Sequence, residues 1–160
     1  MDKNKSAYKL KGLPPIYYTN LDRSPERQKY MEDQFKYWEI EDYTRISGYD
    51  GTGEDDLSGI LKGRYPDQMG PTDVGCCTSH LKAIHHWYTT SDTSCAIMME
   101  DDCDLSVVKH WPFTWKEFYS RMPFDYDLVQ LAVINPGALH VALHKRFVND
   151  FSTACYMITR

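Results

Sequence analysis

Short apolar runs recur along this chain, and polar or glycine-rich segments separate them. Runs rich in β-branched, aromatic and sulfur-containing side chains predict strands, because such side chains fit a buried pleated sheet. The predicted strands cover residues 16–19, 43–46, 95–99, 127–133 and 153–158. The run at 95–99 shows no polar alternation, which is typical of a strand that is covered on both faces.

Three stretches between these runs have helical character. Ser24-Pro25 combines a hydroxyl cap with a first-turn proline, and apolar residues at helical spacing then predict a helix over 25–38. A second helix is expected over 78–88, where apolar residues again share one face. A third is expected over 111–122.

Strands that alternate with helices predict an α/β fold with a mainly parallel sheet flanked by helices. Residues 51–72, rich in glycine and acidic residues, are expected to form a long loop with a helical turn near 57–61. Residues 1–13 are expected to be a flexible lead-in, and residues 14–160 a single domain. Ligands of such sheets bind where the strands end, which here means loops 20–24, 47–52 and 100–104.

The composition fits one globular domain. Of the 160 residues, 42% are hydrophobic and 26% are charged, enough for a core without disulfides or a structural metal. The net charge of −5 argues against nucleic acid as a partner, because a nucleic-acid surface needs clustered cations. The five cysteines cannot all pair within the chain, and we find no signal peptide or transmembrane segment. We therefore expect a cytoplasmic protein.

Four carboxylates follow the apolar run 95–99 within five residues: Glu100, Asp101, Asp102 and Asp104. In an extended chain, Glu100, Asp102 and Asp104 would share one face and Asp101 would take the other. Oxygen ligands at this spacing suit Mg²⁺ or Mn²⁺. The alternative is a solvated acidic turn whose carboxylates cap the next helix.

Two other sets of polar residues allow more than one role. Asn20, Asp22 and Arg23 suit contacts to a ribose or phosphate at a helix start, or equally a plain loop with a helix cap. Cys76 and His80 are four residues apart and supply at most two zinc ligands, whereas structural zinc normally needs four. A Cys–His nucleophile pair lacks a third, orienting residue.

Five segments, in order, resemble glycosyltransferase family 25, which includes bacterial lipooligosaccharide glycosyltransferases and collagen hydroxylysine galactosyltransferases. They are residues 16–27 (IYYTNLDRSPER), 45–51 (RISGYDG), 75–83 (GCCTSHLKA), 96–102 (AIMMEDD) and 125–131 (DYDLVQL). The resemblance implies a GT-A-like (Rossmann-like) fold. It also implies a metal-dependent hexosyltransferase of lipopolysaccharide or other glycan biosynthesis, with a UDP-sugar donor, Mn²⁺ (or Mg²⁺), a sugar or hydroxyl acceptor, and inversion.

The same resemblance implies roles for individual residues. Donor contacts fall on Asn20, Arg23, Arg45 and Asp50, with Ser79 and His80 beside the donor pocket. The metal ligands fall on Glu100, Asp101 and Asp102. The catalytic base is not identified, although Asp127 is a matched acidic residue.

Two departures from the family pattern keep other functions open. Ala154 stands where the later strand of the family has a histidine, and family members usually continue beyond the position of Arg160. We therefore expect a C-terminally truncated acceptor side. The first alternative is a nucleotide-sugar-binding module without transfer activity. The second is an interaction domain that uses its aromatic surface, since 14% of the residues are aromatic.

Overall fold

The computed structural model describes residues 4–53, 62, 69–134, 145–146 and 150–160. Within this part of the chain, five strands form one sheet in the order β2-β1-β3-β5-β4. The strands are β1 (Ile16–Asn20), β2 (Tyr43–Ser47), β3 (Cys95–Glu100), β4 (Leu128–Gln130) and β5 (Cys155–Thr159). β1 pairs in parallel with β2 and β3, whereas β5 runs antiparallel between β3 and β4. The prediction of a Rossmann-like α/β fold, with a sheet that is parallel at its centre, is confirmed.

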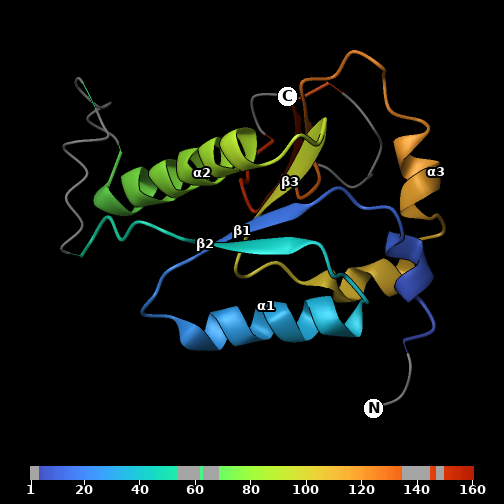
Figure 1. The fold of residues 1–160 in the computed structure, drawn as a ribbon, viewed down its shortest axis with the longest axis horizontal. Coiled ribbons are helices and arrows are strands. Elements are labelled where there is room, and N and C mark those ends of the chain that lie inside the picture. The colour runs from blue at the N-terminus through green and yellow to red at the C-terminus, as the bar shows by residue number, and fades with distance from the viewer. Residues whose placement is uncertain (1–3, 54–61, 63–68, 135–144, 147–149) are drawn as a thin grey trace.

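Two helices cover opposite faces of the sheet, α1 (Pro25–Tyr37) on one side and α2 (Pro71–Thr90) on the other (Figure 1). Alternate residues of the central strands pack against each helix, as the period of two requires. Tyr18 and Ile97 share a core cluster with Phe35 of α1. Tyr17 and Met98 belong to the cluster that contains Ala83 and Trp87 of α2. The sheet is therefore buried on both faces, which explains the continuous apolar run of β3.

The α2 helix starts at Pro71, seven residues before the predicted start at 78. The Asp73 carboxylate accepts a hydrogen bond from the Gly70 N–H, which satisfies one of the free donors at the helix start. Gly75 lies inside the helix. This position needs glycine because the helix backbone closely approaches Gly51, and a Cβ at Gly75 would lie 2.5 Å from the Gly51 nitrogen. The sequence analysis placed Gly70 and Pro71 in the loop over 51–72, because glycine and proline are typical of loops.

The predicted helix over 111–122 is also wrong in its extent. A 3₁₀ helix, η2 (Leu105–His110), precedes it, and only α3 (Trp115–Tyr119) is α-helical. Thr114 and Glu117 form a capping box that starts α3 after the break at Pro112. The predicted helical turn near 57–61 lies outside the described residues.

The N-terminal segment contributes to the core. Residues Ala7–Leu10 form the 3₁₀ helix η1, and Leu10 packs with Trp38 and Val108. The prediction of a flexible lead-in over 1–13 is therefore wrong for residues 7–10. Leu10 packs against Trp38 and Val108, which are distant in the sequence and come close only in the folded chain. In the described part of the chain, no helix combines the length and the apolar character needed to cross a membrane.

Candidate functional site

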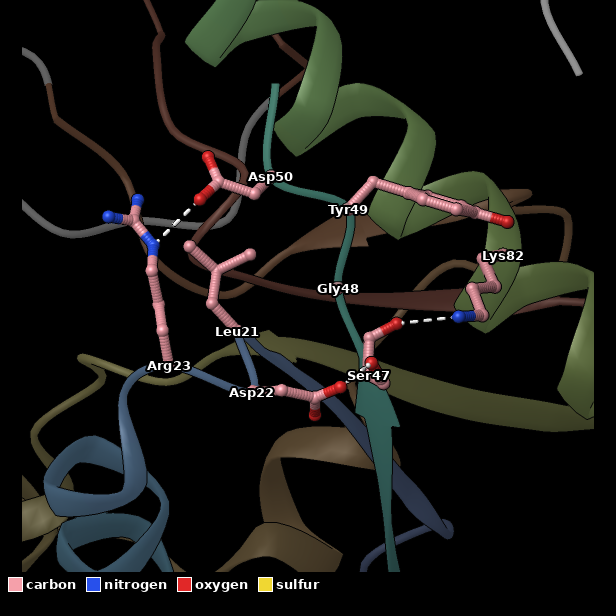
Figure 2. Close-up of a pocket in the computed structure, with 8 residues that line it drawn as sticks. All are labelled: Leu21, Asp22, Arg23, Ser47, Gly48, Tyr49, Asp50 and Lys82. Carbon is pink, nitrogen blue, oxygen red and sulfur yellow. Dashed lines mark hydrogen bonds and ion pairs between the residues drawn. The ribbon is translucent and has the colours of Figure 1, made fainter. Parts of the chain in front are cut away.

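A pocket of about 220 Å³ opens where β1 and β2 end. Figure 2 shows that its walls come from the loop after β1, the end of β2 with the loop that follows it, and one residue of α2. The polar side chains that line it are Asp22, Arg23, Ser47, Tyr49, Asp50 and Lys82. The carboxyl ends of parallel strands are where α/β sheets bind ligands, so the pocket lies in the region that the sequence predicted.

Asp22 forms the acidic side of this pocket. Its carboxylate accepts hydrogen bonds from Arg45 Nη2 at 2.5 Å and from Ser47 Oγ at 2.8 Å. These two donors, Arg45 first, lower the pKa of Asp22 below its ordinary value. Asp22 is therefore ionised at neutral pH and ties the end of β1 to β2.

Two cations face the same pocket. Arg23 Nε lies 2.7 Å from Asp50 Oδ2, and Lys82 Nζ donates to the carbonyl of Ser47 at 2.8 Å (Figure 2). Lys82 Nζ also lies 4.7 Å from the centre of the Tyr49 ring. Hydrogen bonds from Thr52 lower the pKa of Asp50. The pocket thus offers cations, ionised carboxylates and an aromatic ring within one small volume.

Asn20 lies behind the pocket and uses both ends of its side-chain amide. Nδ2 donates to Asp101 Oδ2 at 2.7 Å, and Oδ1 accepts from Arg45 Nε at 2.8 Å. Asn20 is only 2% exposed and Asp101 only 6%. Burial raises the pKa of Asp101, while the bond from Asn20 and the nearby charge of Arg27 oppose that rise. Asn20 therefore joins β1, β2 and the end of β3.

Arg27 pairs with two carboxylates of the acidic cluster after β3. Its guanidinium lies 3.1 Å from Asp101 and 2.7 Å from Asp102. The Asp102 side chain is 53% exposed, so one carboxylate of this pair faces solvent. Oxygen donors of this kind suit Mn²⁺ or Mg²⁺, which often take only one or two protein carboxylates. Asp101 and Asp102, which share the Arg27 guanidinium, therefore have the donor chemistry that such an ion prefers.

The predicted face shared by Glu100, Asp102 and Asp104 is wrong. β3 ends at Glu100, so the alternation of an extended chain does not continue into the acidic cluster. Glu100 faces α2, where its Oε1 lies 3.3 Å from His80 Nε2. Asp104 instead caps η2 by accepting the N–H of Ser106. The three predicted metal ligands, Glu100, Asp101 and Asp102, thus lie on two sides of the sheet.

The predicted donor residues occupy four different positions relative to the pocket. Arg23 and Asp50 line it, whereas Asn20 and Arg45 lie directly behind it. Ser79 is buried and accepts a hydrogen bond from the N–H of Tyr49, so it helps to hold the loop after β2 in place. His80 belongs to the separate contact with Glu100.

Three polar lining residues, Ser47, Tyr49 and Lys82, were not predicted as donor contacts. For Asp22, a ribose or phosphate contact and a plain loop were equal alternatives. Lys82 follows Ser79 by three residues, so the two share a helix face. That spacing was the available signal, but the side of the helix that faces the loop after β2 depends on packing.

A family model described as glycosyltransferase family 25 (LPS biosynthesis protein) matches residues 13–126, well over half of the chain. The chain belongs to glycosyltransferase family 25. No curated protein matches it. The matched segment contains every residue that lines the pocket and the whole acidic cluster. This family 25 member is therefore a glycosyltransferase, an enzyme with a sugar donor and an acceptor, and the pocket lies within its matched region.

Asp127 of this glycosyltransferase lies away from the pocket. It directly precedes β4, whose first residue, Leu128, pairs with Ile158, and Ile158 pairs with Ala96 at the start of β3. Asp127 is thus at the amino end of β3, whereas the pocket is at the carboxyl ends of the strands. The position rules out a direct role for Asp127 at the described pocket.

Proposed function

We propose that this family 25 enzyme is a GT-A-like glycosyltransferase that transfers a hexose from a UDP-sugar to a hydroxyl of a sugar or other acceptor. The proposal includes dependence on Mn²⁺ or Mg²⁺ and inversion at the anomeric carbon. One observation carries it: within the family match, the charged pocket after β1 and β2 adjoins the carboxylates that follow β3.

The pocket suits part of such a donor. Its volume of about 220 Å³ is below the range of about 300–1,000 Å³ usual for complete small-molecule sites. We assign it to the nucleoside end of the donor, with the Tyr49 ring against the base and Asp22 and Asp50 accepting from hydroxyls or ring N–H groups. Arg23 and Lys82 would bind diphosphate oxygens, because charge-assisted hydrogen bonds to phosphate are strong.

Asp101 and Asp102 are the proposed cation ligands. β1 and β3 are adjacent strands, so a donor in the pocket extends its diphosphate toward the end of β3. A bound cation would neutralise negative charge on the departing diphosphate. Glu100 is excluded from this ligand set because it faces His80 on the other side of the sheet.

Inversion requires one displacement at the anomeric carbon. The acceptor oxygen forms its bond to that carbon as the bond to the diphosphate breaks, and a general base takes the hydroxyl proton. In this reaction, Arg23 and Lys82 hold the nucleotide in place and stabilise the leaving group.

A panel of UDP-hexoses tests the donor first. A donor that binds only the folded chain raises the melting temperature, so a thermal-shift screen selects the sugar. Lys82→Met is expected to weaken donor binding by about tenfold, the loss of one charge-assisted hydrogen bond. Lys29→Met is the matched control, since Lys29 lies on α1 and pairs with Asp33. Equal effects of the two variants would contradict the assignment of the pocket.

Turnover with and without Mn²⁺ tests the metal. We expect chelator and Asp102→Ala each to lower the transfer rate by about 100-fold or more. Asp104→Ala is the matched control, because Asp104 caps η2 and is not a proposed ligand. Activity that survives both chelator and Asp102→Ala would overturn the metal role. Binding of UDP with Mn²⁺ but no turnover with any donor or acceptor would overturn the proposed transfer.

A further inference from the structure

A second cluster of ligating side chains lies between α2 and the end of β3. It consists of Cys76 and His80, one helical turn apart on α2, and Glu100, the last residue of β3. In the part of the chain that the structure describes, these three are the group whose sulfur, nitrogen and oxygen atoms all lie within 4.8 Å of one another. The donor pocket does not use them.

Two of the three distances in this cluster are close to those around a tetrahedral metal ion. Zinc bonds of about 2.0–2.2 Å to nitrogen and oxygen place two such ligand atoms about 3.3–3.5 Å apart. His80 Nε2 and Glu100 Oε1 are 3.3 Å apart. Cys76 Sγ and Glu100 Oε1 are 3.9 Å apart, and the longer zinc–sulfur bond widens that edge of the tetrahedron. The Cys76 and Glu100 side chains would therefore move somewhat closer together as an ion binds.

Tyr156 of β5 and Thr153, which precedes β5, hydrogen-bond to two of the three side chains. His80 Nδ1 lies 3.1 Å from the hydroxyl of Tyr156, and Thr153 Oγ1 donates to Glu100 Oε1 at 2.5 Å. Metal-bound histidines usually hydrogen-bond through their second ring nitrogen, which orients the ring and selects the tautomer. Metal binding through Nε2 would place the ring proton of His80 on Nδ1, from which it would donate to the Tyr156 hydroxyl.

The cluster is enclosed but reachable. His80 has 7% of its side chain exposed, whereas Glu100 has 27% exposed, so one side of the cluster is open to solvent. His80 is the largest cause that lowers the pKa of Glu100, which keeps that carboxylate ionised. Burial, with the charge of Glu100, raises the pKa of the Cys76 thiol. A metal would therefore bind with release of the thiol proton to solvent.

We propose that Cys76, His80 and Glu100 bind one Zn²⁺, with a fourth position open on the side of Thr153. Thiolate and imidazole ligands select zinc over Mn²⁺ or Mg²⁺, so this site is distinct from the cation proposed at Asp101 and Asp102. The ion would fasten the first half of α2 to the end of β3. Neither the family assignment nor the proposed donor site is needed for this inference. The sequence disfavoured zinc because it offered two ligands, and the third comes from a strand twenty residues away.

Metal content and cobalt spectroscopy test the site on the full chain. Protein purified without chelator, or reloaded with Zn²⁺ after chelation, is expected to hold one zinc per chain. Replacement by Co²⁺ is expected to give a thiolate-to-cobalt charge-transfer band and the visible bands of a tetrahedral ion. The Cys76→Ser variant should lose that band and most of the zinc. Cys77→Ser is the matched control, because Cys77 is exposed on the same helix, and it should keep both.

Glu100→Gln keeps the size and shape of the side chain, so this variant is expected to fold. It therefore separates a loss of zinc binding from a loss of folding. It should lower zinc affinity by about tenfold or more while circular dichroism remains that of the wild type. Chelation should lower the melting temperature of wild type and of Cys77→Ser, and should leave Cys76→Ser unchanged. A folded wild-type chain that takes up no zinc would overturn the proposal. So would a cobalt complex without a thiolate band, or equal zinc loss in Cys76→Ser and Cys77→Ser.

Discussion

Asn20 Nδ2 lies 2.7 Å from Asp101 Oδ2, and this buried hydrogen bond joins the last residue of β1 to the first residue after β3. The other end of the same amide accepts a bond from Arg45 of β2. Asn20 thereby connects three neighbouring strand ends next to the pocket residue Asp22, which Arg45 also contacts. Without it, a buried carboxylate would lose its amide partner and Arg45 would lose an acceptor.

Asn20→Ala is expected to lower the free energy of unfolding by about 2 kcal/mol, because a buried partner is left unsatisfied. Urea unfolding measures this change. Asn4→Ala is the matched control, since the Asn4 side chain makes an exposed bond to the carbonyl of Tyr37 and a local bond from the N–H of Ser6, and joins no strands. The control should change stability by less than about 0.5 kcal/mol. Similar losses in the two variants would show that the connection at Asn20 contributes little.

Arg27→Gln is expected to tighten Mn²⁺ binding. The guanidinium lies within 3.1 Å of both Asp101 and Asp102, so it competes with a cation for the same oxygens. Loss of a half-exposed ion pair of about 1 kcal/mol corresponds to an apparent Kd about fivefold lower. Titration calorimetry with Mn²⁺ and UDP measures it. Arg121→Gln, on the exposed segment after α3, serves as control. Weaker Mn²⁺ binding in Arg27→Gln would show instead that Arg27 supports the ion.

Asp22→Asn is expected to have a pH-dependent effect on stability. Hydrogen bonds from Arg45 and Ser47 hold the folded pKa of Asp22 below its ordinary value of 3.8. A lowered carboxyl pKa adds stability that is complete above the ordinary value and is lost as pH falls through the folded value. The variant should therefore be less stable than wild type at neutral pH, and the difference should vanish in strong acid.

Unfolding curves at a series of acid and neutral pH values measure that difference. Ser47→Ala removes one of the two donors and should reduce the pH-dependent difference without abolishing it. A stability difference between wild type and Asp22→Asn that stays constant down to strong acid would contradict the interpretation.

Gly75→Ala is expected to destabilise the chain although alanine favours helices. A Cβ at Gly75 would lie 2.5 Å from the Gly51 nitrogen and 2.8 Å from the Tyr49 carbonyl oxygen. The helix gains about 1 kcal/mol from alanine, but a backbone clash costs more, so we expect a net loss of about 1 kcal/mol or more. Because Tyr49 lines the pocket, donor binding should weaken too. Cys77→Ala, at an exposed position of the same helix, should do neither.

Local patterns were sufficient for the elements that position the pocket. The apolar runs of β1, β2 and β3 and the Ser24-Pro25 start of α1 predicted these elements to within about a residue. The start of α2 could not be predicted in this way. Gly75, in the first turns of this helix, is required because the helix backbone there lies against the backbone of Gly51. That close approach exists only in the folded chain.

The same division holds for the site. Arg23 and Asp50 were predicted from their motifs and do line the pocket, but Lys82 was missed because its helix face is chosen by packing. Period-two reasoning grouped Glu100 with Asp102, and it failed because β3 ends at Glu100.

By itself, the sequence determined the order and type of the central elements and the family motifs, since these depend on residues close together in the chain. Tertiary structure alone decided which carboxylate meets which partner. Glu100 lies with His80 and Cys76, while Asp101 and Asp102 lie with Arg27, because the helices α2 and α1 cover opposite faces of the sheet at the point where β3 ends.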